Sequence, residues 1–171
     1  MKNNLSEFRS INIYVDETKN MAVFPKSKNP SYNTENNSPM YILSKTFFEL
    51  AFPYSRESVA ELVKTGIISW DKYDPYTDSK KTIEEYYYNI KSFKSATHKK
   101  KLISLGWDDI EGKYVSLYIP MKKGKYYIEI SSIKLPDEAN WIEFADAVIE
   151  LINMDMNKLN SFKIYKSKLN I

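Results

Sequence analysis

The chain has 171 residues, of which 43% are hydrophobic and 27% charged, and its formal net charge is +3. Length and charge indicate one soluble domain, and the net charge falls short of the concentrated basic surface of a dedicated nucleic-acid binder. The chain has no cysteine, one histidine and four glycines, which excludes thiolate chemistry and leaves little material for His-based, soft-metal or phosphate-cradling sites.

Tyrosine is abundant, with 14 copies in the chain. Tyrosine is enriched where proteins contact each other, because its ring supplies a large contact area at a low entropic cost. The N-terminal residues contain no apolar signal core, and no apolar run approaches the roughly 20 residues of a membrane span. We therefore expect a cytoplasmic binding protein, not an enzyme, with no cofactor, no metal and no membrane partner.

The first half of the chain predicts a β-hairpin followed by short helices. Residues 8–15 alternate between apolar and polar, and residues 21–24 form a second apolar run after a polar turn. Residues 26–39 are polar and contain two prolines, which favours an exposed loop. Two short helices are expected next. The first begins at Ser44 and reaches Phe52, and the second begins at Ser55 and ends at Gly66. A short strand is expected at 67–70.

The second half predicts a helix, a three-stranded meander and a long final helix. A capping box over Thr82–Glu85 begins a helix with Ile83, Tyr86, Tyr87 and Ile90 on one face, and a basic linker follows at 94–101. Strands are expected at 102–107, 113–119 and 125–133. Pro136 and Asp137 are expected to open an amphipathic helix that buries Trp141, Phe144, Val148 and Leu151.

These elements predict an α+β fold, with an antiparallel β-sheet and amphipathic helices packed on one face. We place a single domain at residues 1–156. Residues 157–171 alternate weakly and are expected to form a C-terminal tail or an edge strand.

Two clusters carry candidate chemistry. Asp108, Asp109 and Glu111 could offer oxygen ligands to a hard metal, but the calcium-loop pattern is incomplete and an acidic turn is the simpler interpretation. His98 lies among lysines, which favours its neutral form and suits a general base in principle, but no partner carboxylate is evident. A solvated charge run is the simpler interpretation there.

Aromatic and charged runs suggest binding surfaces. Residues 86–88 are three consecutive tyrosines, so they cannot all face one core, and either a partner contact or a solitary surface aromatic at Tyr88 would explain the third ring. The lysines of the 122–125 turn beside Tyr126 and Tyr127 could contact a nucleic acid, although a hairpin with a basic turn accounts for them as well.

Three stretches together resemble the immunity proteins of bacterial contact-dependent growth inhibition systems. They are the N-terminal hairpin 9–25, the run from Leu105-Gly106-Trp107 to Pro120, and Ile133-Lys134-Leu135-Pro136 leading into the helix 141–152. The resemblance implies a cytoplasmic protein without catalytic residues that binds and silences the C-terminal domain of a cognate toxin, usually a nuclease. The Lys- and Tyr-rich segment 77–101 and the tail after Met154 depart from the pattern.

We expect the toxin to pair with the edge of the predicted sheet or to fill a groove beside it, because an exposed edge offers unpaired backbone groups. A wholly structural hairpin is the alternative. The expected toxin contacts are strand residues directed away from the apolar face and an acidic ridge of the last helix that would attract a basic partner: Tyr114, Tyr118, Tyr127 and Glu129, and Glu143, Asp146 and Glu150.

Two other function classes remain open. The basic linker 94–101 would suit a nucleic-acid-associated or regulatory binding domain, although the modest net charge makes nucleic acid an unlikely partner. A metal-dependent hydrolase using Asp108, Asp109 and Glu111 is the third class.

Overall fold

The computed structural model describes residues 9–30, 41–108 and 112–155. These residues form the predicted α+β fold in one domain, with a six-stranded antiparallel sheet in the order β5-β2-β1-β6-β7-β8 and a small β3-β4 sheet. The strands are β1 (Arg9–Val15), β2 (Met21–Phe24), β3 (Lys26–Lys28), β4 (Tyr41–Leu43), β5 (Phe48–Leu50), β6 (Lys101–Asp108), β7 (Gly112–Pro120) and β8 (Tyr127–Leu135). The helices are α1 (Arg56–Ile68), α2 (Ile83–Tyr87), α3 (Phe93–Ala96) and α4 (Trp141–Asn153).

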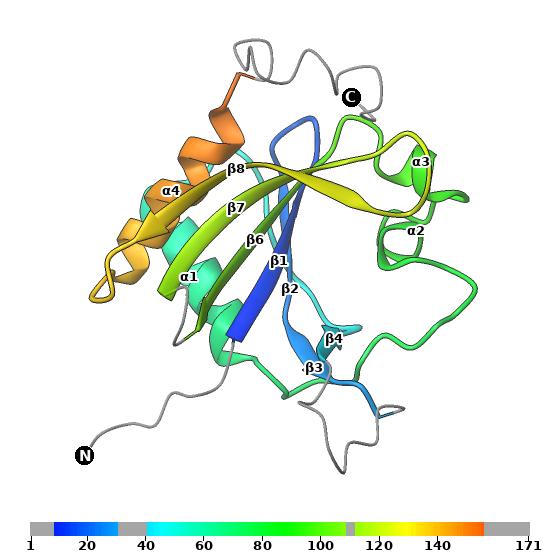
Figure 1. Ribbon diagram of the computed structural model, residues 1–171, viewed down its shortest axis with the longest axis horizontal. Helices are drawn as coiled ribbons and strands as arrows, with labels where there is room; N and C mark the ends of the chain where they lie inside the picture. The colour runs from blue at the N-terminus through cyan, green and yellow to red at the C-terminus, as the bar shows by residue number, and fades with distance from the viewer. Residues whose placement is uncertain (1–8, 31–40, 109–111, 156–171) are drawn as a thin grey trace.

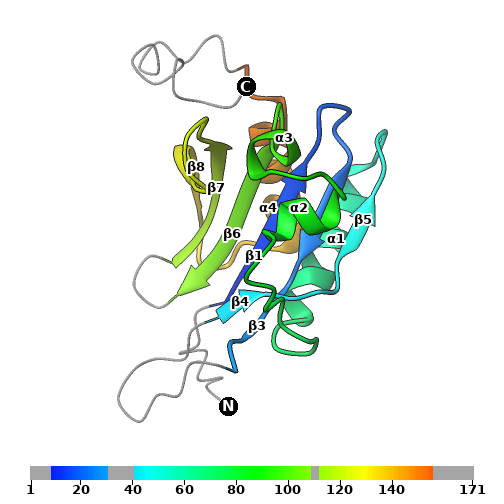
Figure 2. The ribbon, with the colours of Figure 1, turned by 90° about the vertical axis from the view of Figure 1, so that its right-hand side faces the viewer.

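The helices lie on both sides of the twisted sheet (Figures 1 and 2). Figure 2 shows α2 and α3 in front of the sheet, with α1 and α4 behind it. The two long helices therefore pack on one face, as the sequence predicts, and the two short helices add partial cover to the other face. The predicted meander is confirmed as β6-β7-β8, and the predicted N-terminal hairpin is confirmed as β1-β2.

The face behind the sheet is an aliphatic core. Alternate residues of β1, β6 and β7 point into it and are fully buried, as Ile13, Ile103 and Leu117 show. In α4, Phe144, Val148 and Leu151 are buried as predicted, and Trp141 is half-buried against Trp107. This continuous apolar layer is what fixes α1 and α4 on the sheet.

The front face is aromatic. Phe24 is fully buried there and forms edge contacts with the rings of Tyr14 and Tyr87, at centroid distances of 5.3 and 5.4 Å. Ile83 of α2 joins this cluster, and Phe93 of α3 meets the ring of Tyr127 at 5.6 Å. The two short helices are therefore held on the sheet by ring packing.

The helix caps explain where the helices begin. The capping box at Thr82 is present, since the Thr82 hydroxyl accepts the Glu85 N–H and the Glu85 carboxylate accepts the Thr82 N–H. Helix α4 begins later than predicted, because the Asn140 side chain accepts the N–H groups of Ile142 and Glu143. The segment after Pro136 is a turn before that cap.

Helix α1 is longer than predicted, and two predictions about its C-terminal end are wrong. It continues past Gly66 to Ile68, so the expected strand at 67–70 does not form. Gly66 lies inside the helix where α1 comes closest to the sheet, because a Cβ there would stand 2.5 Å from Val23 Cγ1. The glycine that the sequence suggests as a stop signal therefore serves close packing.

The segment 44–52 also differs from its prediction. It forms strand β5 on the outer edge of β2, where Ala22 pairs with Glu49, in place of a helix. Ser44 caps nothing, because its N–H donates to the carbonyl of Pro25 and it forms a bridge with Pro75. The expected loop at 26–39 begins with strand β3, and the basic linker 94–101 includes the last turn of α3. The tail 157–171 lies outside the described residues.

Candidate binding surface

Strand alternation directs the predicted residues of β7 and β8 to the front face. Tyr118 stands opposite Glu129 in the register, and its hydroxyl donates to Glu129 Oε2 at 2.8 Å. Partial burial and this carboxylate raise the pKa of Tyr118 to about 12. Glu129 is exposed, so the pair presents a carboxylate and a ring side by side at the sheet surface.

Tyr127 belongs to a buried polar cluster. Its hydroxyl donates to Glu84 Oε1 at 2.8 Å, and the hydroxyl of Tyr14 donates to the same oxygen at 3.0 Å. Glu84 is only 5% exposed. Burial, together with the nearby Glu84, raises the pKa of both tyrosines well above the usual range. Glu84 therefore joins α2 to two strands, β1 through Tyr14 and β8 through Tyr127.

A second tyrosine–carboxylate pair lies at the β5 end of the sheet. The hydroxyl of Tyr87 donates to Glu49 Oε1 at 2.5 Å. Burial, followed by the contact with Glu49, raises the pKa of Tyr87. These two side chains line a cavity with Asp16 and Tyr88, between the β1-β2 turn and the end of β5.

A row of small polar residues crosses the front face beside these tyrosines. The register places Asn12, Ser104, Ser116 and Ser132 next to one another on four neighbouring strands. The hydroxyls of Ser116 and Ser132 are 2.8 Å apart. Tyr114 lies beside this row with its ring over Gly106, where a Cβ would stand 2.9 Å from the tyrosine hydroxyl.

Strand β8 ends the sheet. It is nine residues long, and no strand of the described residues pairs with its outer edge. The opposite end is the three-residue β5. A β-bulge between Leu117 and Tyr118 interrupts the β7-β8 register close to Glu129. Among the described residues, β8 therefore offers the longer edge to a partner strand, beside the Tyr118–Glu129 pair.

The three acidic residues predicted on the last helix lie behind the sheet, on the side opposite Tyr118 and Glu129. Glu143 accepts the N–H of Asn140 as part of the cap of α4, and Asp146 pairs with Arg56 of α1. Glu150 is exposed. The structure therefore separates the seven predicted contact residues into a group in front of the sheet and a group behind it. Two of the three acidic residues behind the sheet, Glu143 and Asp146, already form contacts within the protein.

The remaining candidate residues do not assemble into a reactive centre in the described part of the chain. His98 is exposed after α3, and Asp109 and Glu111 lie outside the described residues. Across residues 9–30, 41–108 and 112–155, no three His, Asp or Glu side chains gather as metal ligands would. None of the helices in these ranges is long and apolar enough to cross a membrane.

The three consecutive tyrosines are arranged differently from the prediction. Tyr86 is the exposed ring, at 47%, whereas Tyr87 and Tyr88 are half-buried. The ammonium group of Lys100 lies 4.2 Å from the centre of the Tyr88 ring. The helix ends after Tyr87 and turns its Ile83–Tyr87 side inward, so Tyr86 and Ile90 do not share the buried face.

Sequence reasoning missed the carboxylates Glu84 and Glu49. One signal was present in the sequence. The capping box fixes Glu85 at the helix start, and the preceding residue, Glu84, is offset from it by about 100° around the helix axis, toward the sheet. Nothing local, however, pairs Glu84 with Tyr14, which lies 70 residues earlier.

The fold has counterparts among solved structures. No family model matches the chain. No curated protein matches it either. A protein of unknown function from Neisseria meningitidis is similar with a TM-score of 0.58 and 10% identity, over 89% of this chain and 98% of that one. One chain of a CdiA-CT/CdiI toxin and immunity complex from Yersinia pseudotuberculosis is similar with a TM-score of 0.55 and 12% identity, over 85% of this chain and 96% of that one.

Proposed function

We propose that this protein is an immunity protein that binds one cognate toxin domain and neutralises it as a stoichiometric complex. The observation that carries the proposal is the likeness of nearly the whole fold to a chain of a toxin and immunity complex. The three sequence stretches that resemble such immunity proteins fall on β1-β2, on β6-β7 and on the end of β8 that leads into α4. The proposed activity of the toxin is that of a nuclease.

The proposed toxin site is the outer edge of β8 together with the Tyr118–Glu129 pair. Strand addition at an edge gains affinity from backbone hydrogen bonds and specificity from side chains at alternate positions. Tyr118 is half-buried and Glu129 is exposed, whereas Tyr127 is engaged by Glu84 and contributes mainly to the fold. Glu150 on α4 lies on the side opposite this site, so it is proposed to act only through long-range attraction of a basic toxin.

We also propose that neutralisation needs no catalysis by this protein. His98 is exposed in a lysine-rich segment, and no described carboxylate forms an ion pair with it. The variant His98→Ala is therefore expected to retain full protection against the toxin. Loss of protection, with folding and toxin binding intact, would contradict the proposal of a binding-only mechanism.

The test of function is protection of growing bacteria. The neighbouring genes are first searched for one that encodes a large secreted protein, and the C-terminal domain of such a protein is then expressed with and without this protein. We expect growth arrest without the protein, full growth with it, and a purified complex with one copy of each chain. Growth arrest caused by this protein alone would instead identify it as a toxin.

The test of the site uses the same complex. Tyr118→Ala and Glu129→Ala are expected to weaken toxin binding, and the matched exposed variants Lys45→Ala and Glu61→Ala are expected to leave it unchanged. Protection by the wild-type protein together with unchanged affinity of both site variants would retain the function and reject the site.

A further inference from the structure

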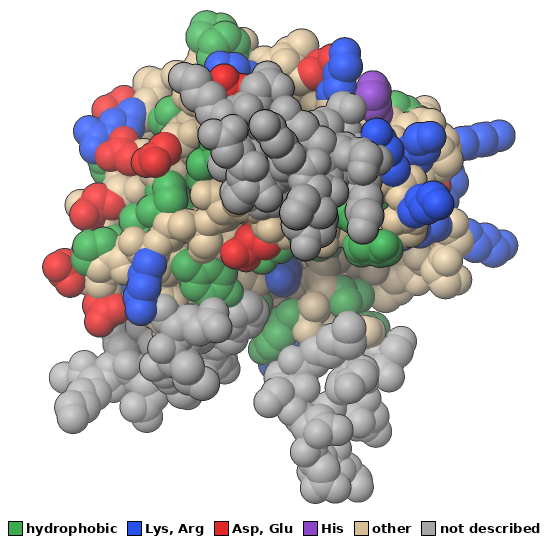
Figure 3. Space-filling model, turned by 45° about the horizontal axis from the view of Figure 1, so that its top comes forward, with side chains coloured by type: hydrophobic (Ala, Val, Ile, Leu, Met, Phe, Trp, Pro, Cys, Tyr) green, Lys and Arg blue, Asp and Glu red, His purple; other side chains and the backbone are tan. Residues whose placement is uncertain are grey.

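The charges of this protein are segregated, although the net charge is small. Residues 78–100 and 121–127 carry nine lysines and three carboxylates, whereas residues 136–155 carry six carboxylates and no lysine or arginine. Figure 3 shows lysines gathered at the right of the molecule and most carboxylates at the left. The molecule therefore has a strongly basic end built from α2, α3 and the β7-β8 turn.

A cavity of about 380 Å³ lies in this basic end. Its walls include three exposed lysines: Lys80 and Lys81, which precede α2 in the chain, and Lys91, which follows it. The backbone of Asn89 and Ser92 has positive φ angles of 52° and 81°, so the chain reverses between α2 and α3. This reversal brings Lys91 to the same cavity as Lys80 and Lys81.

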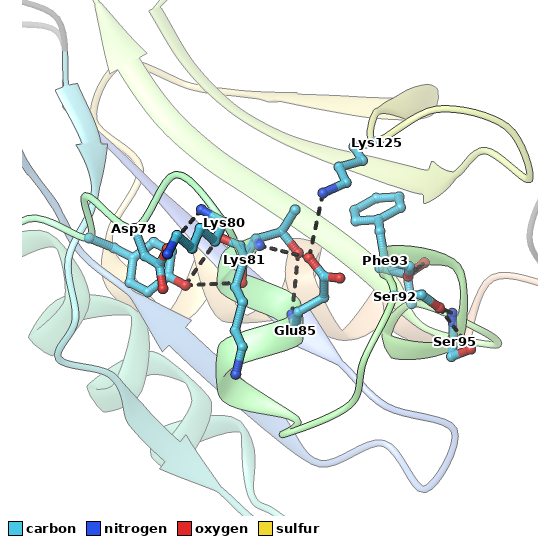
Figure 4. A network of polar contacts seen from close by, with 11 residues as sticks. Asp78, Lys80, Lys81, Glu85, Ser92, Phe93, Ser95 and Lys125 are labelled. Carbon is cyan, nitrogen blue, oxygen red and sulfur yellow. Dashed lines mark hydrogen bonds and ion pairs between the residues drawn. The ribbon is translucent and has the colours of Figure 1, made fainter.

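The lysines of the β7-β8 turn extend the same surface. Lys125 Nζ lies 3.7 Å from Glu85 Oε2, and Glu85 also lines the cavity (Figure 4). The Glu85 side chain is only 10% exposed, and its carboxylate also accepts the Thr82 N–H. Glu85 therefore positions Lys125 beside the cavity, and the exposed Lys122 and Lys123 lie in the same turn.

Two exposed aromatic rings lie on the same elements as these lysines, Tyr86 on α2 and Tyr126 in the β7-β8 turn. Tyr126 is 55% exposed and Tyr86 47% exposed, and they are among the most exposed large apolar residues of the described chain. The ring of Tyr126 packs over Gly124, because a Cβ at that glycine would overlap the ring. Tyr126 is therefore held in place beside three lysines without being buried.

We propose that this basic end, called here the lysine surface (Lys80, Lys81, Lys91, Lys122, Lys123, Lys125, Tyr86 and Tyr126), binds single-stranded nucleic acid. Lysine ammonium groups contact backbone phosphates without reading sequence, and exposed rings stack on unpaired bases. An acidic protein partner would use the cations but has no bases for the rings to stack on. The proposal goes beyond toxin binding and does not depend on it.

The test measures the binding of fluorescently labelled homopolymers of about 12 nucleotides, as RNA and as DNA, to the purified protein by anisotropy. With four or five phosphate contacts, affinity is expected to fall by roughly 50- to 130-fold between about 50 and about 200 mM salt. Comparing RNA with DNA shows which backbone is preferred. Absence of binding at about 50 mM salt with protein up to about 100 µM would overturn the proposal.

The decisive variant is the triple change Lys80→Gln, Lys81→Gln and Lys91→Gln. It is expected to reduce the log–log salt slope by about 2, since each phosphate contact to a single strand contributes about 0.7. The matched control, Lys45→Gln, Lys72→Gln and Lys134→Gln, removes the same charge from exposed sites outside the lysine surface and is expected to change the slope little. An equal reduction of the salt slope in both triple variants would show that only the overall charge of the protein matters and would reject the site.

Two further measurements separate stacking and competing partners. Tyr126→Ala is expected to weaken binding about 5-fold or more without changing the salt slope. Bound oligonucleotide should protect the surface lysines of the wild-type protein, but not Lys45 or Lys72, from chemical acetylation, which tests the site without any variant. Displacement of the oligonucleotide by poly-glutamate of equal charge, at equal concentration, would favour an acidic protein partner and overturn the proposal.

Discussion

The two faces of the sheet use the same strands for different purposes. Behind the sheet, Ile11, Ile13 and their neighbours pack with α1 and α4 into a mainly aliphatic layer. In front, the alternate residue Tyr14 directs a hydroxyl at the buried carboxylate of Glu84. The rear face depends on filling volume alone, whereas the front face combines ring packing with directed hydrogen bonds.

This difference bears on where a partner can bind. The rear face is closed by two long helices, so its residues serve stability. The front face is covered only in part by α2 and α3 and ends at β8, where ring and carboxylate groups reach the surface. Variants of the two faces are therefore expected to differ in size of effect and in pH dependence.

The largest effect is expected on the rear face. Phe144→Ala removes a ring that is 2% exposed and contacts Trp107 and Trp141, and it should lower the free energy of unfolding by about 3–5 kcal/mol. Denaturant unfolding measures this change. A loss below about 1 kcal/mol would mean that α4 does not depend on this packing.

A smaller effect is expected from the polar centre of the front face. Glu84→Ala leaves two tyrosine hydroxyls without their acceptor and should cost about 2–4 kcal/mol. The exposed control Glu61→Ala should cost almost nothing. If Tyr14→Phe were as destabilising as Glu84→Ala, the second hydrogen bond, from Tyr127, would contribute nothing.

The front face should also make the protein sensitive to alkali. The pKa of tyrosine is about 10 in an unfolded chain and is raised in the folded protein for Tyr14, Tyr118 and Tyr127. Above pH 10 the unfolded state therefore loses protons that the folded state keeps, and stability falls as pH rises.

Each fully buried tyrosine can contribute up to about 1.4 kcal/mol per pH unit to this loss. Denaturant unfolding from about pH 8 to about pH 11 measures the slope, and absorbance of tyrosinate shows whether ionisation accompanies unfolding. Tyr14→Phe should give a shallower slope than the wild type. A wild-type stability that stays constant over this range would contradict the account.

The smallest effect on stability is expected at the surface of α4. The double variant Asp146→Asn and Glu150→Gln should lower the free energy of unfolding by about 1 kcal/mol or less, because both side chains are exposed and the loss is limited to the surface ion pair of Asp146 with Arg56. Under the proposed function, it should slow association with a basic toxin by a few-fold at low salt. Glu143 is left unchanged because it caps the helix.

The sequence predicts best where periodicity alone decides the structure. The strands β1, β6, β7 and β8 and the apolar face of α4 follow directly from alternation and helical spacing. The segment 44–52 was predicted as a helix because its serine and phenylalanine spacing suits one. It forms a strand because the edge of β2 is available, and tertiary context overrides such local preferences.

The candidate site was predictable only in part. Alternation placed Tyr118 and Glu129 away from the apolar face, and the register then paired them. The carboxylate of Glu84 and the cavity formed by Lys80, Lys81 and Lys91 depend on how α2 sits on the sheet. Contacts between distant segments of this kind leave no local pattern to interpret.

The position of β1 has a consequence for how the chain is made. This strand lies between β2 and β6, so Val15 must pair with Lys101, and Arg9 must pair with Trp107. At about 5 to 20 residues per second, the β1-β2 hairpin waits about 4 to 17 seconds for its second neighbour, and a lone hairpin is barely stable in water. Nascent chains that stop before β6 should therefore remain unfolded on the ribosome, and folding after release should be slow for a chain of this size.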